Sequence, residues 1–436
     1  MKHKISLFDI ADLIAFSAIL FISSFHVPNF SLITSILLLP SYILILKYAF
    51  KRSYFIKFEP KSLKKKHFFL PLILLTIFCL FFFISEVNYN YIPFLDAICF
   101  SIKIILYYIL GICVANSKSF YRFYSIPFLV LCITGGGILF AFLSLLGTKG
   151  VSITASSIMA QRSVFSLWTD EQINGPSIDM YNYLGICLLP FIFKLFAELK
   201  QKTNVNMIFL FTLILSVFLF LVSSYSSLSL LARTPIFCFF GSILIQIFHE
   251  IVSSRKAVSR VIFKYGLLFI IPLMIFYLQP DTLEDISRSL NLGIFKRFDN
   301  SGLETPRYLV WSIVFTEMWS HPFGGREIIL PISDIGIPVN YAHNIWLDIA
   351  FDAGILPMFC LGIFHLIHWP YLWDLISNPK YNDSLSSFLR CNLVAVISAF
   401  IGTPVLQANL HYFSISCFLL GLIIGIMQEK YYCKNE

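Results

Sequence analysis

A histidine and an amide stand directly before an apolar stretch in the segment Tyr341–Pro357, YAHNIWLDIAFDAGILP. A histidine can accept a proton from an attacking hydroxyl near neutral pH, so His343 is a candidate for activating or orienting an acceptor. If the segment is helical, Asn344, Asp348 and Asp352 are four residues apart and share one face. This spacing predicts a polar stripe that leads from His343 along the mouth of a cavity. The alternatives are that the histidine has a structural role and that the carboxylates pair with loop arginines.

Arg233 is a second candidate, in the segment SSLSLLARTPIFCFF. We expect it about one and a half turns inside a membrane helix, where a charged side chain is costly unless it faces a partner or a water-filled cavity. The serines from Ser223 to Ser229 favour a water-filled cavity. The alternative is an arginine whose long side chain reaches the lipid headgroups.

Basic residues also occur in two long polar stretches, at about 148–179 and 280–342. Several are arginines, whose planar group suits phosphate oxygens and can stabilise a lipid diphosphate as it departs. We favour Arg307, which begins a predicted amphipathic helix, over Arg288 and Arg297. A solvated surface or contact with lipid phosphate is the alternative for each. The basic residues of the two stretches are Lys149, Arg162, Arg288, Lys296, Arg297, Arg307 and Arg326.

The elements that position these residues are predicted to be membrane helices. The 436 residues are 58% hydrophobic and include 47 Phe, and apolar runs of about 20 residues recur along the chain. We therefore expect an all-α polytopic membrane protein, one membrane domain over residues 1–436, with about twelve transmembrane helices. The first run is too long for a signal peptide and is predicted to be retained. The expected spans are 7–27, 30–50, 68–86, 94–116, 123–147, 180–198, 207–227, 228–251, 265–279, 345–370, 387–406 and 409–429.

Lysine and arginine clusters predict the orientation of these helices. They fall in loops on one side, whereas the short opposite loops near 87–93 and 407–411 carry neither residue. By the positive-inside rule the basic side is cytoplasmic and holds both termini. The net charge of +8 follows this topology, so we expect no nucleic-acid partner.

The two long polar stretches then form outer, periplasmic loops, and long loops with their own structure are usually functional. In the loop 280–342, Thr305 is a predicted N-cap and Pro306 a predicted first helical residue. Trp311 and Trp319 indicate that this helix lies on the membrane interface.

The cysteines give no sign of a disulfide framework or a zinc site, because they lie in or beside apolar spans or in the C-terminal tail and no CxxC occurs. The chain also has no P-loop and no carboxylate cluster for a metal in its outer loops. We expect no cofactor and no metal.

His343 and Asn344, followed after nine residues by Gly354, resemble the H-N-x9-G signature of the bacterial O-antigen ligase and polymerase family. The upstream segment from RYLVW to HPFGG is similar to that family's arginine–tryptophan and P-x-G-x-G approach to the same histidine, although Gly324 and Gly325 are adjacent here. The family also places an arginine at the outer end of a membrane helix, which matches Arg233. About twelve helices with a large outer loop before the histidine match as well.

The resemblance implies a C-type membrane glycosyltransferase fold in the bacterial inner membrane, with an active site facing the periplasm. Such enzymes take glycan from undecaprenyl diphosphate without a nucleotide sugar or an obligatory metal. Arg233 and Arg307 would hold the donor diphosphate, and His343 would activate or orient the acceptor hydroxyl, supported by Asn344 and Asp348. A ligase passes the glycan to lipid A-core, and a polymerase passes it to the next lipid-linked repeat unit. We favour the ligase.

A transporter of lipid-linked oligosaccharides is the alternative from another class. It would carry charges near the bilayer midplane and often repeated halves. Lys103 lies well inside an apolar span and has no role in the transferase scheme, but the sequence shows no repeat. A purely structural assembly factor is a further alternative. The arginines of the outer loops fit this alternative less well than they fit an enzyme.

Overall fold

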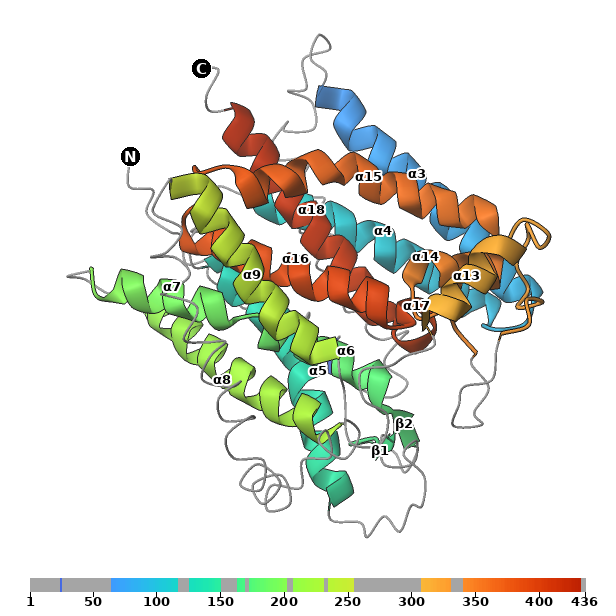
Figure 1. Cartoon of the computed structure of the whole chain (residues 1–436), viewed down its shortest axis with the longest axis horizontal. Helices are drawn as coiled ribbons and strands as arrows, with labels where there is room; N and C mark the ends of the chain where they lie inside the picture. The colour runs from blue at the N-terminus through green and yellow to red at the C-terminus, as the bar shows by residue number, and fades with distance from the viewer. Residues whose placement is uncertain are drawn as a thin grey trace.

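Apolar helices make up most of the structure (Figure 1), a computed structural model. It describes residues 24–25, 64–116, 125–149, 163–168, 172–201, 207–230, 234–254, 307–330 and 340–432. Nine segments in this part are long and apolar enough to cross a membrane. The chain is therefore a mostly helical polytopic membrane protein. The expected spans 30–50 and 265–279, and nearly all of 7–27, lie outside the described residues, so the total of twelve stays a prediction.

The described membrane helices follow the expected order, with shifts at their ends and two divided spans, and two short strands were not expected. Large apolar side chains are exposed along their outward faces, for example Leu95, Phe237 and Leu366, as lipid-facing helices require. The elements are α3 (Lys64–Asn88), α4 (Phe94–Asn116), α5 (Ser125–Lys149), β1 (Ser163–Phe165), β2 (Gln172–Asn174), α6 (Gly175–Ile186), α7 (Leu189–Leu199), α8 (Met207–Ser229), α9 (Thr234–Ser254), α13 (Arg307–Glu317), α14 (Ile345–Ala353), α15 (Ile355–Ser377), α16 (Ser384–Gly402), α17 (Val405–Ala408) and α18 (Leu410–Tyr432).

The last helix, α18, forms the centre of the bundle and packs closely on α4 (Figure 1). A Cβ at Gly111 would lie 2.1 Å from the carbonyl oxygen of Phe418, and one at Gly421 would lie 2.2 Å from that of Tyr108. Small residues at a membrane helix contact let the two backbones approach this closely. The core therefore depends on glycine at these two positions.

The first outer loop, expected at 148–179, has structure of its own. It contains an antiparallel pair of short strands, with Ser163 opposite Asn174 and Phe165 opposite Gln172. The span expected at 180–198 agrees with the apolar segment Asp179–Leu199, although its first helix, α6, starts at Gly175 inside this loop. The same span is also divided, and α7 resumes with Pro190 in its first turn. Proline has no backbone N–H and suits that position.

The span expected at 345–370 is two helices, α14 and α15, rather than one. They meet at Gly354, which has φ 92° and ψ −175°. A Cβ there would lie 2.1 Å from the carbonyl oxygen of Pro322, and that same oxygen accepts a hydrogen bond from the Ile355 N–H at 3.0 Å. The conformation and the close contact both require glycine. The break lets the turn after α13 dock between the two helices.

Several loops predicted to be on the outer side meet at one end of the bundle. In Figure 1, α13, α14 and α17 gather there. The short loop between α3 and α4 reaches the same place, because the Tyr91 hydroxyl donates to the carbonyl oxygen of Gly325 at 3.1 Å. We call this end, formed by residues 89–93, 307–330, 340–344 and 403–409, the outer end. The meeting agrees with the predicted alternation of loops.

Candidate functional site

The helix α13 packs one face on α14 and exposes the other. Val310, Val314 and Met318 are buried, in a cluster with Ala350 and Phe351 of α14. This helix begins at Arg307, and the predicted cap at Thr305 and Pro306 lies outside the described residues.

The outward face of α13 is apolar. Tyr308, Phe315 and Trp319 are exposed, and the Trp319 ring lies 6.3 Å from that of Phe359 on α15. An exposed aromatic face continuous with a spanning helix is what an interfacial position requires.

Trp311 fastens α13 to the loop that carries the histidine. Its indole Nε1 donates a hydrogen bond of 2.6 Å to the carbonyl oxygen of Ala342, the residue before His343. The sequence indicated only a membrane-interface role for this tryptophan. The structure instead gives it a partner within the protein, which fixes the backbone next to His343.

His343 has a strained backbone that its neighbours hold in place. Its φ of 57° is in the left-handed region, which an L-residue other than glycine adopts uncommonly. Asn344 is the N-cap of α14, and its side chain accepts hydrogen bonds from the backbone N–H groups of Trp346 at 3.2 Å and Leu347 at 3.3 Å. Such strain persists only where the surrounding structure maintains it.

Asp348 completes this arrangement from inside α14. Its buried carboxylate accepts from the N–H of Ala342 at 2.7 Å and from the N–H of Asn344 at 3.1 Å. The residues on either side of His343 thus donate backbone hydrogen bonds to one carboxylate. Of the two residues predicted to support the histidine, Asp348 holds the backbone on either side of it, and Asn344 caps the helix that follows.

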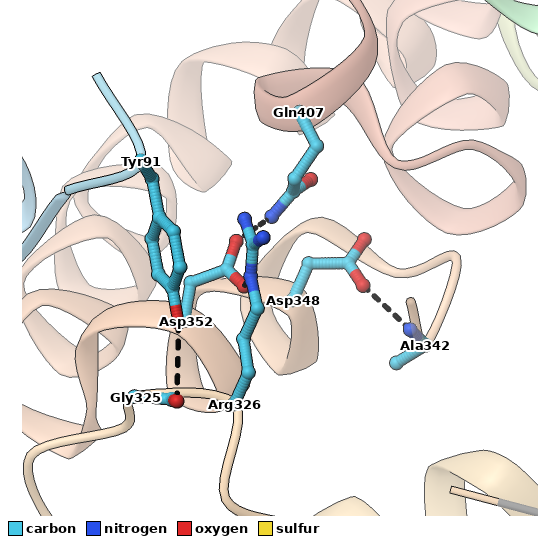
Figure 2. A network of polar contacts seen from close by, with 7 residues as sticks. All are labelled: Tyr91, Gly325, Arg326, Ala342, Asp348, Asp352 and Gln407. Carbon is cyan, nitrogen blue, oxygen red and sulfur yellow. Dashed lines mark hydrogen bonds and ion pairs between the residues drawn. The ribbon is translucent and has the colours of Figure 1, made fainter. Parts of the chain in front are cut away.

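The predicted polar stripe along α14 is divided between two tasks. Figure 2 shows Asp348 turned toward Ala342 and Asp352 turned away from it, toward Arg326. Asp352 Oδ1 pairs with Arg326 Nε at 2.7 Å, and Gln407 Nε2 donates to its other oxygen. The alternative, that a carboxylate of this helix pairs with a loop arginine, therefore holds for Asp352.

Arg326 is also covered on one face by an aromatic ring. Its guanidinium carbon lies 3.8 Å from the ring centroid of Tyr91. We call Tyr91, Arg326, Asp352 and Gln407 the Arg326 cluster. It joins three segments that are far apart in sequence.

Burial governs the charge of both aspartates. It raises the pKa of Asp348 well above its usual value, and the charge of Asp352 raises it further, against the hydrogen bonds from the backbone. Burial also raises the pKa of Asp352, although Arg326 and Gln407 offset part of the rise. Burial alone would lower the pKa of Arg326, but the hydrogen bond and charge of Asp352 raise it above its usual value.

Arg307 extends from the start of α13 toward two other helices. A Cβ at Gly402, the last residue of α16, would lie 3.6 Å from Nη1 of Arg307 and 3.3 Å from the side chain of Thr234. Thr234 begins α9 and follows Arg233 in the chain. The structure thus places Arg307 and His343 at the same end of the bundle, linked through Trp311. The predicted site residues Arg233, Arg288 and Arg297 lie outside the described residues.

The serine-rich segment of α8 packs against α6, where a water-filled cavity was expected. Ser223, Ser226 and Ser227 are buried, and a Cβ at Gly185 would lie 1.9 Å from the Ser223 hydroxyl. Ser227 donates to Asp179 at 2.7 Å. Serine is small enough for close helix contacts in membranes, which accounts for its packing on Gly185. The hydroxyls of Ser223, Ser226 and Ser229 have no hydrogen-bond partner among the described residues, so the expected cavity stays a prediction.

The sequence did not single out Arg326, Tyr91 or Gln407 as site residues. Arg326 was one of several basic residues in a long loop, and the loops of Tyr91 and Gln407 were noted only for lacking positive charge. Two adjacent glycines before Arg326 were the only local signal of an unusual backbone there.

Metal ligation has no candidate among the residues that the structure describes, where no three His, Cys, Asp or Glu side chains are grouped for it. Comparison with known protein families gives no match, and comparison with curated proteins gives no significant match.

Proposed function

We propose that the chain is a membrane glycosyltransferase that moves O-antigen or a related polysaccharide from undecaprenyl diphosphate to an acceptor sugar. The observation that supports this most is the link between Arg307 and His343. The helix that begins with Arg307 holds, through Trp311, the residue that precedes His343. An arginine for a diphosphate and a histidine for a hydroxyl thus share one end of a membrane bundle.

In the proposed reaction, an acceptor hydroxyl attacks the anomeric carbon of the lipid-linked glycan from the face opposite the diphosphate. The new C–O bond forms as the bond to the diphosphate breaks, and the leaving diphosphate takes the electron pair. Arg307 and Arg233 stabilise the charge that develops on it, with Arg288 and Arg297 as further candidates. His343 accepts the hydroxyl proton or orients the hydroxyl, and a good leaving group makes either role sufficient.

The acceptor that we propose is lipid A-core, which makes the protein a ligase of lipopolysaccharide biosynthesis in the bacterial inner membrane. A repeat-unit polymerase uses the same donor and the same site, and differs only in its acceptor. The ligase preference rests on the family resemblance.

A transporter is the second candidate, and one observation favours it. Lys103 lies midway along α4, and its Nζ is 6.0 Å from the ring centroids of both Phe100 and Tyr107. No acidic side chain in the described part of the chain forms an ion pair with it. A charged residue at that depth is a common feature of transport pathways.

A transfer assay tests the proposal. Purified protein in liposomes receives undecaprenyl-diphosphate-linked repeat units from the source organism, with or without lipid A-core. Wild type is compared with His343→Ala, Arg307→Ala and the control His321→Ala, which removes a partly exposed histidine elsewhere at the outer end. We expect wild type to form glycosylated lipid A-core. The rate of its formation should fall by a factor of about 100 or more in the first two variants and stay unchanged in the control.

Other results of the assay lead to different conclusions. Longer lipid-linked chains made without lipid A-core would identify a polymerase. Full activity in both His343→Ala and Arg307→Ala would remove the assigned site. No product from intact substrates in any preparation would contradict the transferase and favour transport, which a flipping assay with the same liposomes then measures.

A further inference from the structure

Both the backbone and the side chain of Arg326 are held in place by specific contacts. It has φ 58° and follows Gly324 and Gly325, with φ 75° and 84°, so three successive residues are in the left-handed region. The N–H groups of Gly325 and Arg326 donate to the carbonyl oxygens of Asp352 and Phe351 at 2.9 and 3.0 Å. The backbone, the Asp352 ion pair and the Tyr91 ring together fix the guanidinium in one position.

One edge of that guanidinium remains available. A guanidinium has five N–H donors, of which the one on Nε is used by Asp352. Neither Nη1 nor Nη2 donates to an acceptor in the described part of the chain, and the side chain is 32% exposed. The four remaining donors therefore belong to a rigidly held, partly exposed side chain.

The charges around Arg326 disfavour an anion at this edge. Asp352 is fully buried against it and forms an ion pair with its Nε at 2.7 Å. This buried carboxylate neutralises most of the charge of the guanidinium. A phosphate would meet little net positive charge, whereas neutral hydroxyl oxygens accept from Nη1 and Nη2 without that penalty.

Aromatic side chains lie close to the backbone before Arg326, where a Cβ at Gly325 would be 2.9 Å from the Tyr89 ring. Tyr89 is 37% exposed and stacks on Tyr91 with ring centroids 5.8 Å apart, and its hydroxyl lies 3.5 Å from the carbonyl oxygen of Phe323. Phe323 itself is 78% exposed. Planar donors beside exposed rings suit a sugar, because hydroxyls take the hydrogen bonds while the C–H face of the ring packs on the aromatics.

We propose that Arg326, Tyr89 and Phe323 form a binding subsite for a neutral sugar ring of the glycan substrate. This inference rests on the proposed function. Arg326 and His343 are connected to opposite ends of the nine-residue helix α14, which is about 13 Å long. The subsite therefore binds a sugar some distance from the reacting one, and it affects affinity rather than the chemical step.

The experiment measures binding apart from catalysis, with the full chain in detergent. The probes are the oligosaccharide released from the organism's lipid-linked repeat unit, the dephosphorylated core oligosaccharide, and inorganic diphosphate. The variants are Arg326→Lys, which keeps a charge for Asp352 but loses the planar edge, and Tyr89→Ala. Glu327→Gln changes the adjacent exposed residue and serves as the control. The midpoint of thermal unfolding is measured for each.

We expect both subsite variants to bind one oligosaccharide about tenfold more weakly, consistent with loss of hydrogen bonds to a charged group, while diphosphate binding stays unchanged. The oligosaccharide affected tells whether the sugar belongs to donor or acceptor. In the transfer assay, KM for that substrate rises about tenfold and kcat stays within about twofold. Glu327→Gln should match wild type.

Three results would overturn the subsite. Wild type could bind neither oligosaccharide, or the folded variants could bind both oligosaccharides with the affinity of wild type. The third is an Arg326→Lys variant with weaker binding of diphosphate and unchanged binding of oligosaccharide. Weakened oligosaccharide binding without transfer in any preparation would keep the subsite and remove the proposed function. Transfer activity with an unchanged KM in Arg326→Lys would support the proposed function and contradict the subsite. Tyr89→Ala decides the question if Arg326→Lys does not fold.

Discussion

Residues in the left-handed backbone region surround α14 at the outer end. His343 comes just before the helix, Gly354 just after it, and Arg326 docks on its last turn. Each position is maintained by a specific contact, whether from Asp348, from the carbonyl oxygen of Pro322 or from Asp352. Strained residues of this kind cluster where a side chain must be held in one orientation. Here the proposed function uses His343 and the proposed subsite uses Arg326.

Gly354 gives a test of this strain. The variant Gly354→Ala should lower stability by more than about 2 kcal/mol, because its Cβ clashes with Pro322 and its φ of 92° suits glycine alone. Gly362→Ala is the matched control in α15, since a Cβ there meets nothing within 4 Å. Thermal unfolding of the two variants in detergent measures the difference. Equal midpoints would contradict the account of the helix break.

Asp348 predicts a dependence of stability on pH. Its folded-state pKa is raised by burial above the unfolded value of about 3.9, so its proton stabilises the fold fully below that value. The contribution is lost as the pH rises through the folded-state pKa. Asp348→Asn lacks this titration, and its single oxygen leaves a backbone N–H without an acceptor, which costs about 1–3 kcal/mol.

The measurement for Asp348 is the midpoint of thermal unfolding at several pH values between about 4 and 8. The advantage of wild type over Asp348→Asn should be largest at the acidic end and shrink toward the basic end. Glu317→Gln, an exposed carboxyl on α13, is the control and should show no such trend. An advantage that grows with pH would show that the buried group is not destabilised as a carboxylate.

At the scale of elements, α13 acts as a bridge between the membrane surface and the histidine loop. Its buried residues Val310 and Val314 pack toward α14, and its exposed aromatics continue the lipid-facing surface of α15. The indole of Trp311 provides a polar link from this helix to the loop. The position of His343 therefore depends on how α13 sits.

Substitutions at two tryptophans of this region distinguish the effect of that hydrogen bond from the effect of general packing. Trp311→Phe keeps the ring and removes the hydrogen bond to Ala342, so stability should fall by only about 1 kcal/mol. Transfer activity should fall by about tenfold, because the backbone at His343 loses its fixed position. Trp319→Phe, in an exposed site, should change neither by as much. Comparable activity losses in both variants would point to membrane attachment as the common cause.

At the scale of the whole molecule, the two ends of the bundle are built differently. The outer end joins loops through the Arg326 cluster. The opposite end is closed by the buried Arg390 of α16, which donates to Gln246 at 3.2 Å and to the carbonyl oxygens of Leu375 and Tyr381 at 3.1 and 2.8 Å. A buried arginine with several acceptors is a structural element, and it ties α9, α15 and α16 together.

Labelling of single cysteines tests the arrangement of the two ends. In a background without the ten native cysteines, Asn88→Cys and Glu327→Cys should react with an impermeant maleimide added to spheroplasts. Lys380→Cys, in the loop between α15 and α16, should react only after lysis, because it belongs to the side that the basic loops place in the cytoplasm. Reaction at Asn88 and Glu327 from different sides would contradict the fold, and inverted labelling of all three would reverse the orientation.

The sequence determined the class of fold and the order of most membrane helices. Composition and the length of apolar runs are local properties, and a membrane converts them directly into helices because unpaired backbone groups are too costly in lipid. The cap of α14 is also a local feature, since Asn344 and Asp348 act within a few residues of one another, although Asn344 was expected on the face of the helix. The break at Gly354 was missed because a glycine inside an apolar run does not by itself end a helix.

Only the tertiary structure decided which residues meet. Tyr91 and Arg326 are separated by more than two hundred positions, and Gln407 reaches Asp352 from a third segment. Such pairs depend on how the helices pack, and no local pattern encodes them. The same reason explains why Trp311 was assigned to the interface, whereas its hydrogen bond to Ala342 was not predicted. Composition tells that a side chain is polar or aromatic, but only packing provides its partner.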